Sequence, residues 1–352
     1  VFGHMDRTHE VSVLHLAGSN SSDFYVSQSI SFAEETVIQA GTSNIFGVAY
    51  PDGTWRLGSD LENLGSALTL PQFLERLPPI DIVVPYMFCR AGMTAFRSLF
   101  EDILKIPVFG PTASSNSISM DKHHTRELVS ANGVRVPNGL LLRSKSEADQ
   151  YAFAFPKIVK PNCEDNSLGL SLVHDEAHLD HALDQAFAYD SEVLIEDYIA
   201  GREVRVAVVE TEDGIFVPSI KEYLVNEQHP IRHSDDKISF DIHGKALEEP
   251  VAGYIATQCP ASLDNEVRDE LVDFSRKAHL ALGCRHYSLF DFRIETATGR
   301  AFFLEAGLFW TIGPNSIITQ MLTASNINPN ETFMSLLQQA IAQDKPAKLG
   351  MN

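Results

Sequence analysis

The chain has 352 residues, a formal net charge of −20, and 44% hydrophobic and 21% charged residues. This composition is typical of a globular protein of two or three domains, and the strong negative charge argues against nucleic acid as a general partner. No apolar run approaches the roughly 20 residues that a bilayer requires, so we expect no membrane span and a cytoplasmic protein.

The first third of the sequence alternates between strand-like and helix-like segments. In chain order, the patterns predict a strand at 11–16, a helix at 25–40, a strand at 45–49, a helix at 70–77, a strand at 80–85, a helix at 94–104 and an apolar run at 106–110. This alternation predicts a parallel, doubly wound layer whose ligand sites follow the strand ends. We expect this domain to span 5–116, because residues 1–4 resemble the remnant of a cleaved tag and 111–116 are rich in Thr, Ser and Ala.

In the rest of the chain, the sequence patterns predict two segments that each contain both helices and strands. The first, 117–197, holds a helix near 119–133, strands at 155–161, 170–173 and 193–198, and a helix at 177–189. The second, 198–345, is rich in β pattern at 203–225 and 285–306, with a helix at 264–282 between them. The fold class is therefore predicted to be α/β.

Two acidic residues, Asp291 and Glu305, interrupt apolar and aromatic runs that we expect to pair as a β-hairpin. A buried carboxylate needs a cation to compensate for its lost hydration. Two facing carboxylates supply oxygen ligands of the kind that Mg²⁺ takes when it also holds nucleotide phosphates. The alternative is that each acid pairs with an arginine, Arg293 or Arg300 for instance, which we favour for one carboxylate but less for two.

A polar loop follows the predicted strand that ends at Lys160. The loop contains Ser167 and Gly169, and its N–H groups and hydroxyls could close over phosphates above the lysine, although such residues also fill ordinary turns. Farther along, a strand edge at 196–199 could present its backbone to an adenine, and Glu203 could accept ribose hydroxyls. Taken singly, each acid is as readily a solvated turn residue.

The order of these parts resembles the ATP-grasp superfamily, and four motifs resemble its D-alanine–D-alanine ligase branch over roughly residues 80–330. These motifs are Asp121-Lys122, Ile158-Val159-Lys160-Pro161, Gly201-Arg202-Glu203-Val204 and Phe303-Leu304-Glu305-Ala306. The resemblance implies an ATP-grasp fold with two α+β subdomains that clamp ATP. It implies nucleotide contacts from Lys122, Lys160, Ser167, Glu196, Asp197, Tyr198, Ile199 and Glu203. It also implies that Asp291 and Glu305 hold Mg²⁺ or Mn²⁺, and that Lys237 reaches the γ-phosphate.

Three departures from that branch argue against a simple D-alanine ligase. Its His-Gly-rich loop is replaced by residues 87–94, its arginine two residues before the first metal ligand is Leu289, and its asparagine two residues after the second acid is Gly307.

Longer runs resemble the ATP-grasp ligases of mycosporine-like amino acid biosynthesis, at 14–19, 85–94, 221–225, 282–293 and 303–308, and the likeness covers nearly the whole chain from Met5. It implies that ATP phosphorylates the cyclohexenone oxygen of mycosporine-glycine. A free amino acid such as serine or threonine then attacks, giving a disubstituted iminomycosporine such as shinorine or porphyra-334. Lys160, Lys237 and Arg293 would neutralise the charge that develops.

Substrate contacts are predicted at four residues. Ser316 matches a serine that binds the amino acid's carboxylate in related ligases, although a helix N-cap is at least as good an interpretation. Gly18, Ser19 and Arg90 are candidates for the carboxylate of the glycine arm. Two alternatives remain, a D-alanine–D-alanine or other dipeptide ligase and a nucleotide-binding protein that has lost catalysis. A homodimer is expected by analogy alone.

Overall fold

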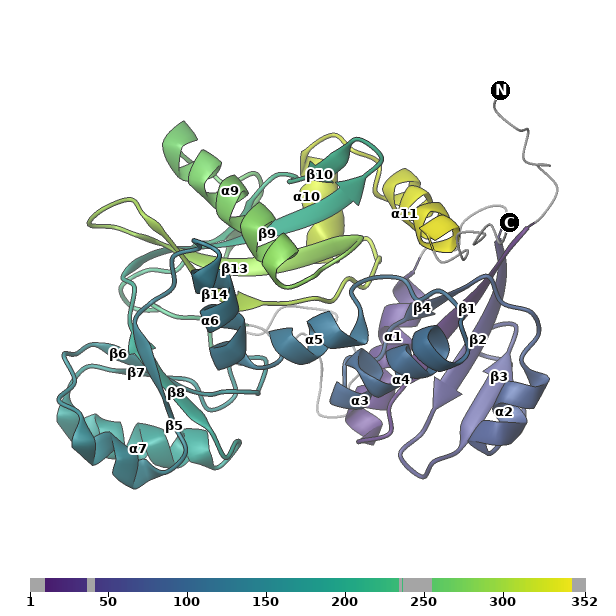
Figure 1. Ribbon diagram of the computed structural model, residues 1–352, viewed down its shortest axis with the longest axis horizontal. Coiled ribbons are helices and arrows are strands. Elements are labelled where there is room, and N and C mark those ends of the chain that lie inside the picture. The colour runs from purple at the N-terminus through teal and green to yellow at the C-terminus, as the bar shows by residue number, and fades with distance from the viewer. Residues whose placement is uncertain (1–9, 37–41, 234–235, 237–254, 344–352) are drawn as a thin grey trace, which may run out of the picture.

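The computed structural model describes residues 10–36, 42–233, 236 and 255–343. Within those ranges the strands form three sheets, and Figure 1 shows one sheet at each end of the molecule and the third between them. Among the described helices, none is long and apolar enough to cross a membrane.

The N-terminal sheet has the strand order β3-β2-β1-β4. Its members are β1 (Val11–Gly18), β2 (Thr42–Ala49), β3 (Trp55–Gly58) and β4 (Ile82–Pro85). Both β2 and β4 pair with β1 in parallel, which confirms the predicted parallel layer, and β3 adds an antiparallel edge that the sequence pattern did not reveal. Helices α1 (Asp23–Glu35) and α2 (Leu70–Arg76) lie where helices were predicted.

The segment between the first two sheets is more helical and more broken than expected. The predicted helix at 94–104 corresponds to α4 (Ala95–Ser98) followed by a π-helical turn η1 (Leu99–Ile103). A further short helix, α3 (Arg90–Met93), precedes it and is separated from α4 by Thr94, which adopts φ −125° and ψ −81°. The supposed boundary at 111–116 largely belongs to α5 (Ala113–Ser119), whose N-cap Thr112 accepts a hydrogen bond from the Ser115 N–H. Helix α6 (Lys122–Ala131) follows, capped by Asp121.

A small antiparallel sheet of order β5-β8-β6-β7 comes next. It comprises β5 (Gly139–Leu142), β6 (Lys157–Pro161), β7 (Ser171–Val173) and β8 (Val193–Asp197), with a 3₁₀ turn η2 (Lys145–Gln150). Helix α7 (Glu176–Phe187) lies along this sheet (Figure 1), and Val159, Ile195 and Leu183 help to form a hydrophobic core of its own.

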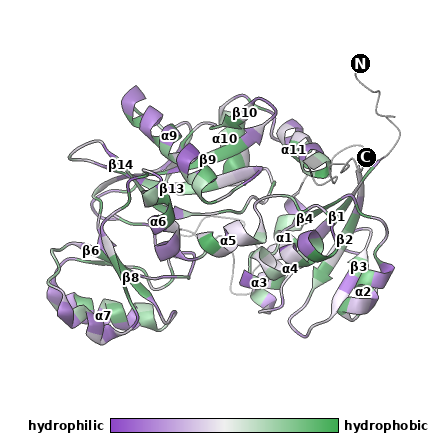
Figure 2. Cartoon of the chain, in the orientation of Figure 1, coloured by the Kyte–Doolittle hydropathy of each residue, from purple (hydrophilic) through white to green (hydrophobic). Residues whose placement is uncertain are grey.

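The C-terminal sheet is the largest and has the order β12-β11-β9-β13-β14, with β10 paired to β9. Its strands are β9 (Gly201–Thr211), β10 (Gly214–Phe216), β11 (Lys221–Tyr223), β12 (Thr257–Gln258), β13 (Tyr287–Glu295) and β14 (Ala301–Ala306). The helices are α9 (Asn265–Ala281), α10 (Ile317–Ala324) and α11 (Pro329–Gln343). In Figure 2, α10 is mostly hydrophobic and α9 carries hydrophilic residues on its outer turns.

Alternation along β9 and β13 divides their side chains between two cores. One face places Val206 and Phe290 in a core with Leu271 of α9. The other face places Ala207 and Leu289 in a core that continues through Trp310 to Val13 of the N-terminal sheet and to α10 and α11. This second face also carries the polar residues described next.

Candidate functional site

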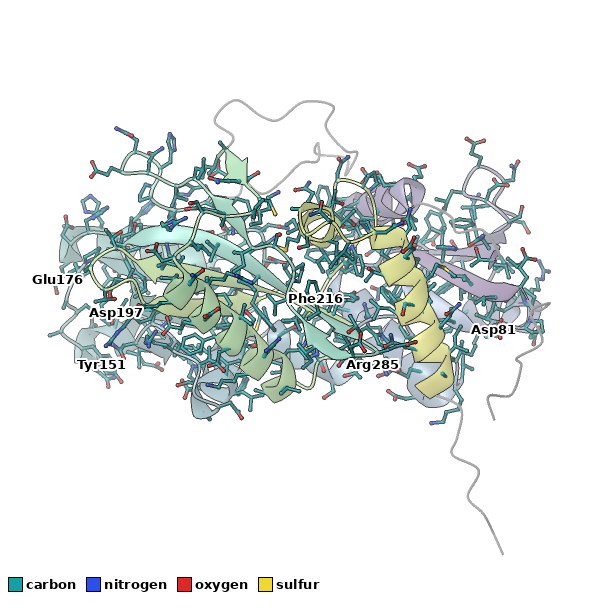
Figure 3. All side chains as sticks on the ribbon, turned by 90° about the horizontal axis from the view of Figure 1, so that it is seen from above. Asp81, Tyr151, Glu176, Asp197, Phe216 and Arg285 are labelled. Carbon is teal, nitrogen blue, oxygen red and sulfur yellow. The ribbon has the colours of Figure 1, made fainter. Side chains whose placement is uncertain are left out.

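A pocket opens between the small sheet and the C-terminal sheet. Eleven of the predicted site residues line it, namely Lys122, Lys160, Ser167, Glu196, Asp197, Tyr198, Ile199, Glu203, Asp291, Arg293 and Glu305. Apolar walls from Ile158, Leu170 and Ile231 suit a flat aromatic ring, and the lysines suit phosphates. In the view of Figure 3, Tyr151, Glu176 and Asp197 lie toward one end of the molecule and Asp81 lies at the opposite end.

Asp291 and Glu305 face each other across β13 and β14, as the hairpin prediction required. Asp291 is 2% exposed and Glu305 is partly buried, and both line the pocket. Mg²⁺ in nucleotide sites is typically held by one or two carboxylates plus substrate phosphates, so this donor set fits the ion.

The cation beside Asp291 is neither of the two arginines named from the sequence. Arg205 of β9 binds Asp291 through both carboxylate oxygens, at 2.5 and 2.9 Å, and Arg232 approaches to 3.6 Å. Burial alone would lower the pKa of the Arg205 guanidinium, but the charge of Asp291 raises that pKa well above its ordinary value. The arginine therefore stays charged beside the predicted metal ligand.

Arg293, predicted to act in catalysis, is held by backbone groups. Its Nη2 donates to the carbonyls of Gly201 and Pro230 at 2.9 and 2.8 Å, and its guanidinium lies 5.1 Å from the centre of the Tyr198 ring. These contacts join the start of β9 to the segment before Arg232. The catalytic role of Arg293 stays a prediction.

Lys160 and Glu196 form a buried ion pair of 2.5 Å, and Arg126 lies 3.7 Å from the same carboxylate. The expectation of a strand edge at Glu196 was wrong, because β8 pairs with β5 on one side and with β6 on the other. Glu196 and Asp197 both line the pocket, and the chain leaves the sheet after Asp197.

The loop after Lys160, which joins β6 to β7, contacts the segment around Arg232 and the start of α6. The Ser167 hydroxyl donates to the Arg232 carbonyl at 2.9 Å, and Lys122 donates to the carbonyls of Glu164 and Asn162. Arg232 in turn pairs with Glu203, the predicted ribose ligand.

Four other predicted residues, Gly18, Ser19, Arg90 and Ser316, are not among the described residues that line this pocket. Ser19 is fully buried and its hydroxyl hydrogen-bonds to that of Ser21, while Arg90 is exposed at the start of α3. Gly18 adopts φ +93°, and a Cβ there would lie 2.0 Å from the Ala49 carbonyl oxygen, so close packing requires the glycine. Ser316 caps α10. Lys237 lies outside the described residues.

The sequence analysis missed Arg126, Arg205 and Arg232. Arg205 carried a usable signal, because Glu203 and Arg205 alternate with Val204 and Val206 along one predicted strand, which indicates a polar face. Nothing comparable marked Arg126, which lies on a helix, or Arg232, which follows a loop.

Comparisons with known proteins agree on one family. The family described as "D-ala D-ala ligase C-terminus" matches residues 132–338. The D-alanine–D-alanine ligase of Citrifermentans bemidjiense is 30% identical over 239 residues, which cover 68% of this chain and 72% of that protein. The enzyme of the same name from Corynebacterium glutamicum is 29% identical over 267 residues, or 75% and 71%.

Solved structures share the whole fold. The VanG D-Ala:D-Ser ligase from Enterococcus faecalis superposes with a TM-score of 0.75 at 20% identity, covering 94% of this chain and 99% of that one. The Bacillus anthracis D-alanine–D-alanine ligase complexed with ATP gives 0.67 at 18% identity, covering 95% and 99%. These structures confirm the predicted ATP-grasp fold.

The named relatives agree with the dipeptide-ligase alternative better than with the mycosporine interpretation. With the family match spanning more than half of the sequence and the opposed carboxylates and lysines gathered in one pocket, the chain belongs to the D-alanine–D-alanine ligase family and is an ATP-grasp ligase that forms C–N bonds with ATP and Mg²⁺ as cofactors.

Proposed function

We propose that this ligase joins the amino group of a free amino acid, of the serine or threonine type, to mycosporine-glycine. This choice of acceptor rests on the residues at two positions near the predicted metal ligands, Leu289 near Asp291 and Gly307 near Glu305. The comparisons support a second candidate, the dipeptide ligation after which the relatives are named.

Leu289 occupies the position of the branch's arginine, two residues before Asp291. It is 5% exposed, lies opposite Ala207 in β9, and belongs to the apolar core shared with Trp310. A guanidinium at this position would stabilise the oxyanion formed when an amine attacks an acyl phosphate. A phosphorylated cyclohexenone forms no such carboxylate-derived oxyanion, so its ligase needs no arginine here.

Gly307 occupies the position of the branch's asparagine, two residues after Glu305. A Cβ built at Gly307 would meet no described atom closer than the Leu289 carbonyl oxygen at 3.9 Å. Packing therefore does not require glycine, and the absent side chain leaves space beside Glu305. That space favours an acceptor larger than alanine.

The chemistry assigns distinct tasks to the chain's own residues. Lys122 and Lys160 hold the phosphates, and Asp291 and Glu305 would hold Mg²⁺, which supplies charge neutralisation for phosphoryl transfer. The acceptor oxygen takes the γ-phosphoryl group and ADP is released. The amine then forms the C–N bond, and phosphate leaves with that oxygen while the amine gives up its protons to form the imine. The protein contributes orientation and exclusion of water, and no protein nucleophile is needed.

The decisive experiment measures ADP release and product mass with ATP, Mg²⁺ and one acceptor at a time. We expect turnover with mycosporine-glycine plus serine or threonine, and little with D-alanine alone. The reverse pattern would establish the dipeptide ligase, and ATP binding without turnover in either case would indicate a protein that has lost catalysis.

Two variants test the metal pair within this experiment. Asp291→Asn and Glu305→Gln should abolish turnover, whereas Glu295→Gln, at the far end of β13, should keep it as the matched control. Full product formation in both metal-pair variants would show that these carboxylates are not the metal site. The expected homodimer is a separate proposal, which light scattering of the purified protein tests.

A further inference from the structure

Four charged side chains form one row across the C-terminal sheet. Lys221 of β11 lies opposite Arg205 of β9, Arg205 lies opposite Asp291 of β13, and Asp291 lies opposite Glu305 of β14. Directly opposed residues project from the same face of a sheet, so the row runs from two cations to two anions. The proposed reaction uses the anions and leaves the cations unexplained.

Lys221 is the member of the row whose charge is least compensated. It is 6% exposed, and its Nζ donates to the Oε1 of Gln320 at 2.5 Å. No carboxylate in the described ranges pairs with it. Its neighbour Glu222 projects to the other face and forms a bidentate pair with Arg202. A buried ammonium that has a neutral partner and faces Arg205 is stabilised when an anion binds.

Gln320 connects Lys221 to the start of α10. Its Nε2 donates to the Asn315 carbonyl at 2.9 Å, directly before the N-cap Ser316. The Ser316 hydroxyl, predicted to bind a substrate carboxylate, is already engaged, because it donates to the Thr319 hydroxyl at 2.7 Å and accepts from the Trp310 indole at 3.0 Å. Lys221 therefore brings to this helix end a full positive charge that Ser316 does not supply.

The spacing of the strands sets the scale of a ligand. Neighbouring strands lie about 4.8 Å apart, so the backbone of Lys221 lies roughly 10 Å from that of Asp291, two strands away. A small molecule that reacts near Asp291 and carries a carboxylate can extend along the row toward Lys221.

We propose that Lys221, held in place by Gln320, binds the carboxylate of one of the two ligase substrates. This inference rests on the proposed function in one respect, because it assumes that the carboxylate bound by Lys221 belongs to a substrate of the ligase. Two sources share this chemistry, the α-carboxylate of the incoming amino acid and the carboxylate of the acceptor. Lys221 is accordingly a residue that determines specificity for an acid over its neutral amide.

The experiment compares each substrate with its carboxamide in the full-length protein, one arm for the amino acid and one for the acceptor. Wild type should prefer the acid in one arm by about 10- to 100-fold in kcat/KM, the value of a charged hydrogen bond. Lys221→Met should lose that preference and raise KM for that substrate by a similar factor, with KM for ATP within about twofold. Lys221→Arg should keep part of the preference, and Lys277→Met on the surface of α9 is the matched control.

The possible outcomes separate the two proposals. Wild-type turnover that is indifferent to the carboxylate in both arms, or a Lys221→Met variant that keeps the wild-type preference, would overturn the role of Lys221 alone. A lack of any amine-dependent turnover in wild type would overturn the proposed function itself. If Lys221→Met melts below the assay temperature, Gln320→Leu replaces it, and an unchanged preference in that variant counts against the proposal.

Discussion

Replacing Arg205 with methionine should destabilise the protein and make its stability depend on Mg²⁺. The substitution keeps most of the aliphatic stem but removes the guanidinium that holds both oxygens of Asp291. Asp291, 2% exposed, would keep Arg232 at 3.6 Å as its nearest described cation. The wild-type protein should depend much less on added metal, because Arg205 already compensates for the charge of Asp291.

We expect Arg205→Met to lower the free energy of unfolding by about 3 kcal/mol. Removing one partner of a buried ion pair costs about 3–5 kcal/mol, since the other charge is left uncompensated. The lower end applies here because Arg232 remains and the Arg205 side chain is 18% exposed. Mg²⁺ bound by Asp291 and Glu305 should recover part of the loss, because a ligand that binds only the folded state stabilises it.

Urea unfolding at fixed pH, with and without millimolar Mg²⁺, measures both effects for wild type, Arg205→Met, Asp291→Asn and the double variant. The double-mutant cycle isolates the coupling between the two residues. We expect the double variant to be more stable than Arg205→Met alone, because it contains no uncompensated buried carboxylate, and to show no response to Mg²⁺. A loss below about 1 kcal/mol in Arg205→Met, or an equal Mg²⁺ response in all four proteins, would refute the reasoning.

Three further predictions concern separate parts of the structure. Lys160→Met should lower kcat/KM for ATP by about 100-fold, and Lys145→Met, whose lysine pairs with Asp180 and Asp184 of α7 away from the pocket, by less than about fivefold in an ADP-release assay. Burial lowers the pKa of His286 to about 3 from 6.5. As the pH falls below 6.5, His286 therefore binds a proton in the unfolded state but stays neutral in the folded state. Urea unfolding should show about 2 kcal/mol of stability lost by pH 5 from this residue, and His286→Asn should remove that part of the slope. Gly18→Ala should cost about 2 kcal/mol or more and lower the melting temperature, since its Cβ would clash with the Ala49 carbonyl; an unchanged melting curve would contradict the close approach.

Helices and strands were predicted well from the sequence where a single hydrophobic periodicity, helical or alternating, extended over the whole segment. The strand at Val11, the helix from Asn265 to Ala281 and the hairpin that opposes Asp291 to Glu305 all follow from local patterns and a single turn. Helix α5 was missed because its signal was a single cap, Thr112, within a run of small polar residues.

The partners of the site residues were harder to predict because they depend on register between distant strands. Arg205 and Asp291 are separated by 86 positions, and their pairing follows from how β9 lies against β13. A sequence pattern gives the face on which a side chain projects but not the residue opposite it. For the same reason the chain's nearest arginine, Arg293, was the natural but wrong choice for the cation beside Asp291.

The core around Trp310 has a consequence for dividing the chain into fragments. Phe109, from the segment that closes the N-terminal sheet, lies 6.1 Å from Trp310 and 5.1 Å from Phe333 between ring centres, and Val13 belongs to the same apolar cluster. A fragment that begins at residue 117 would lose Val13 and Phe109 and expose these aromatic rings to water. Such a fragment should aggregate unless the N-terminal segment is supplied as a separate chain, in which case the two pieces should reassociate through this surface.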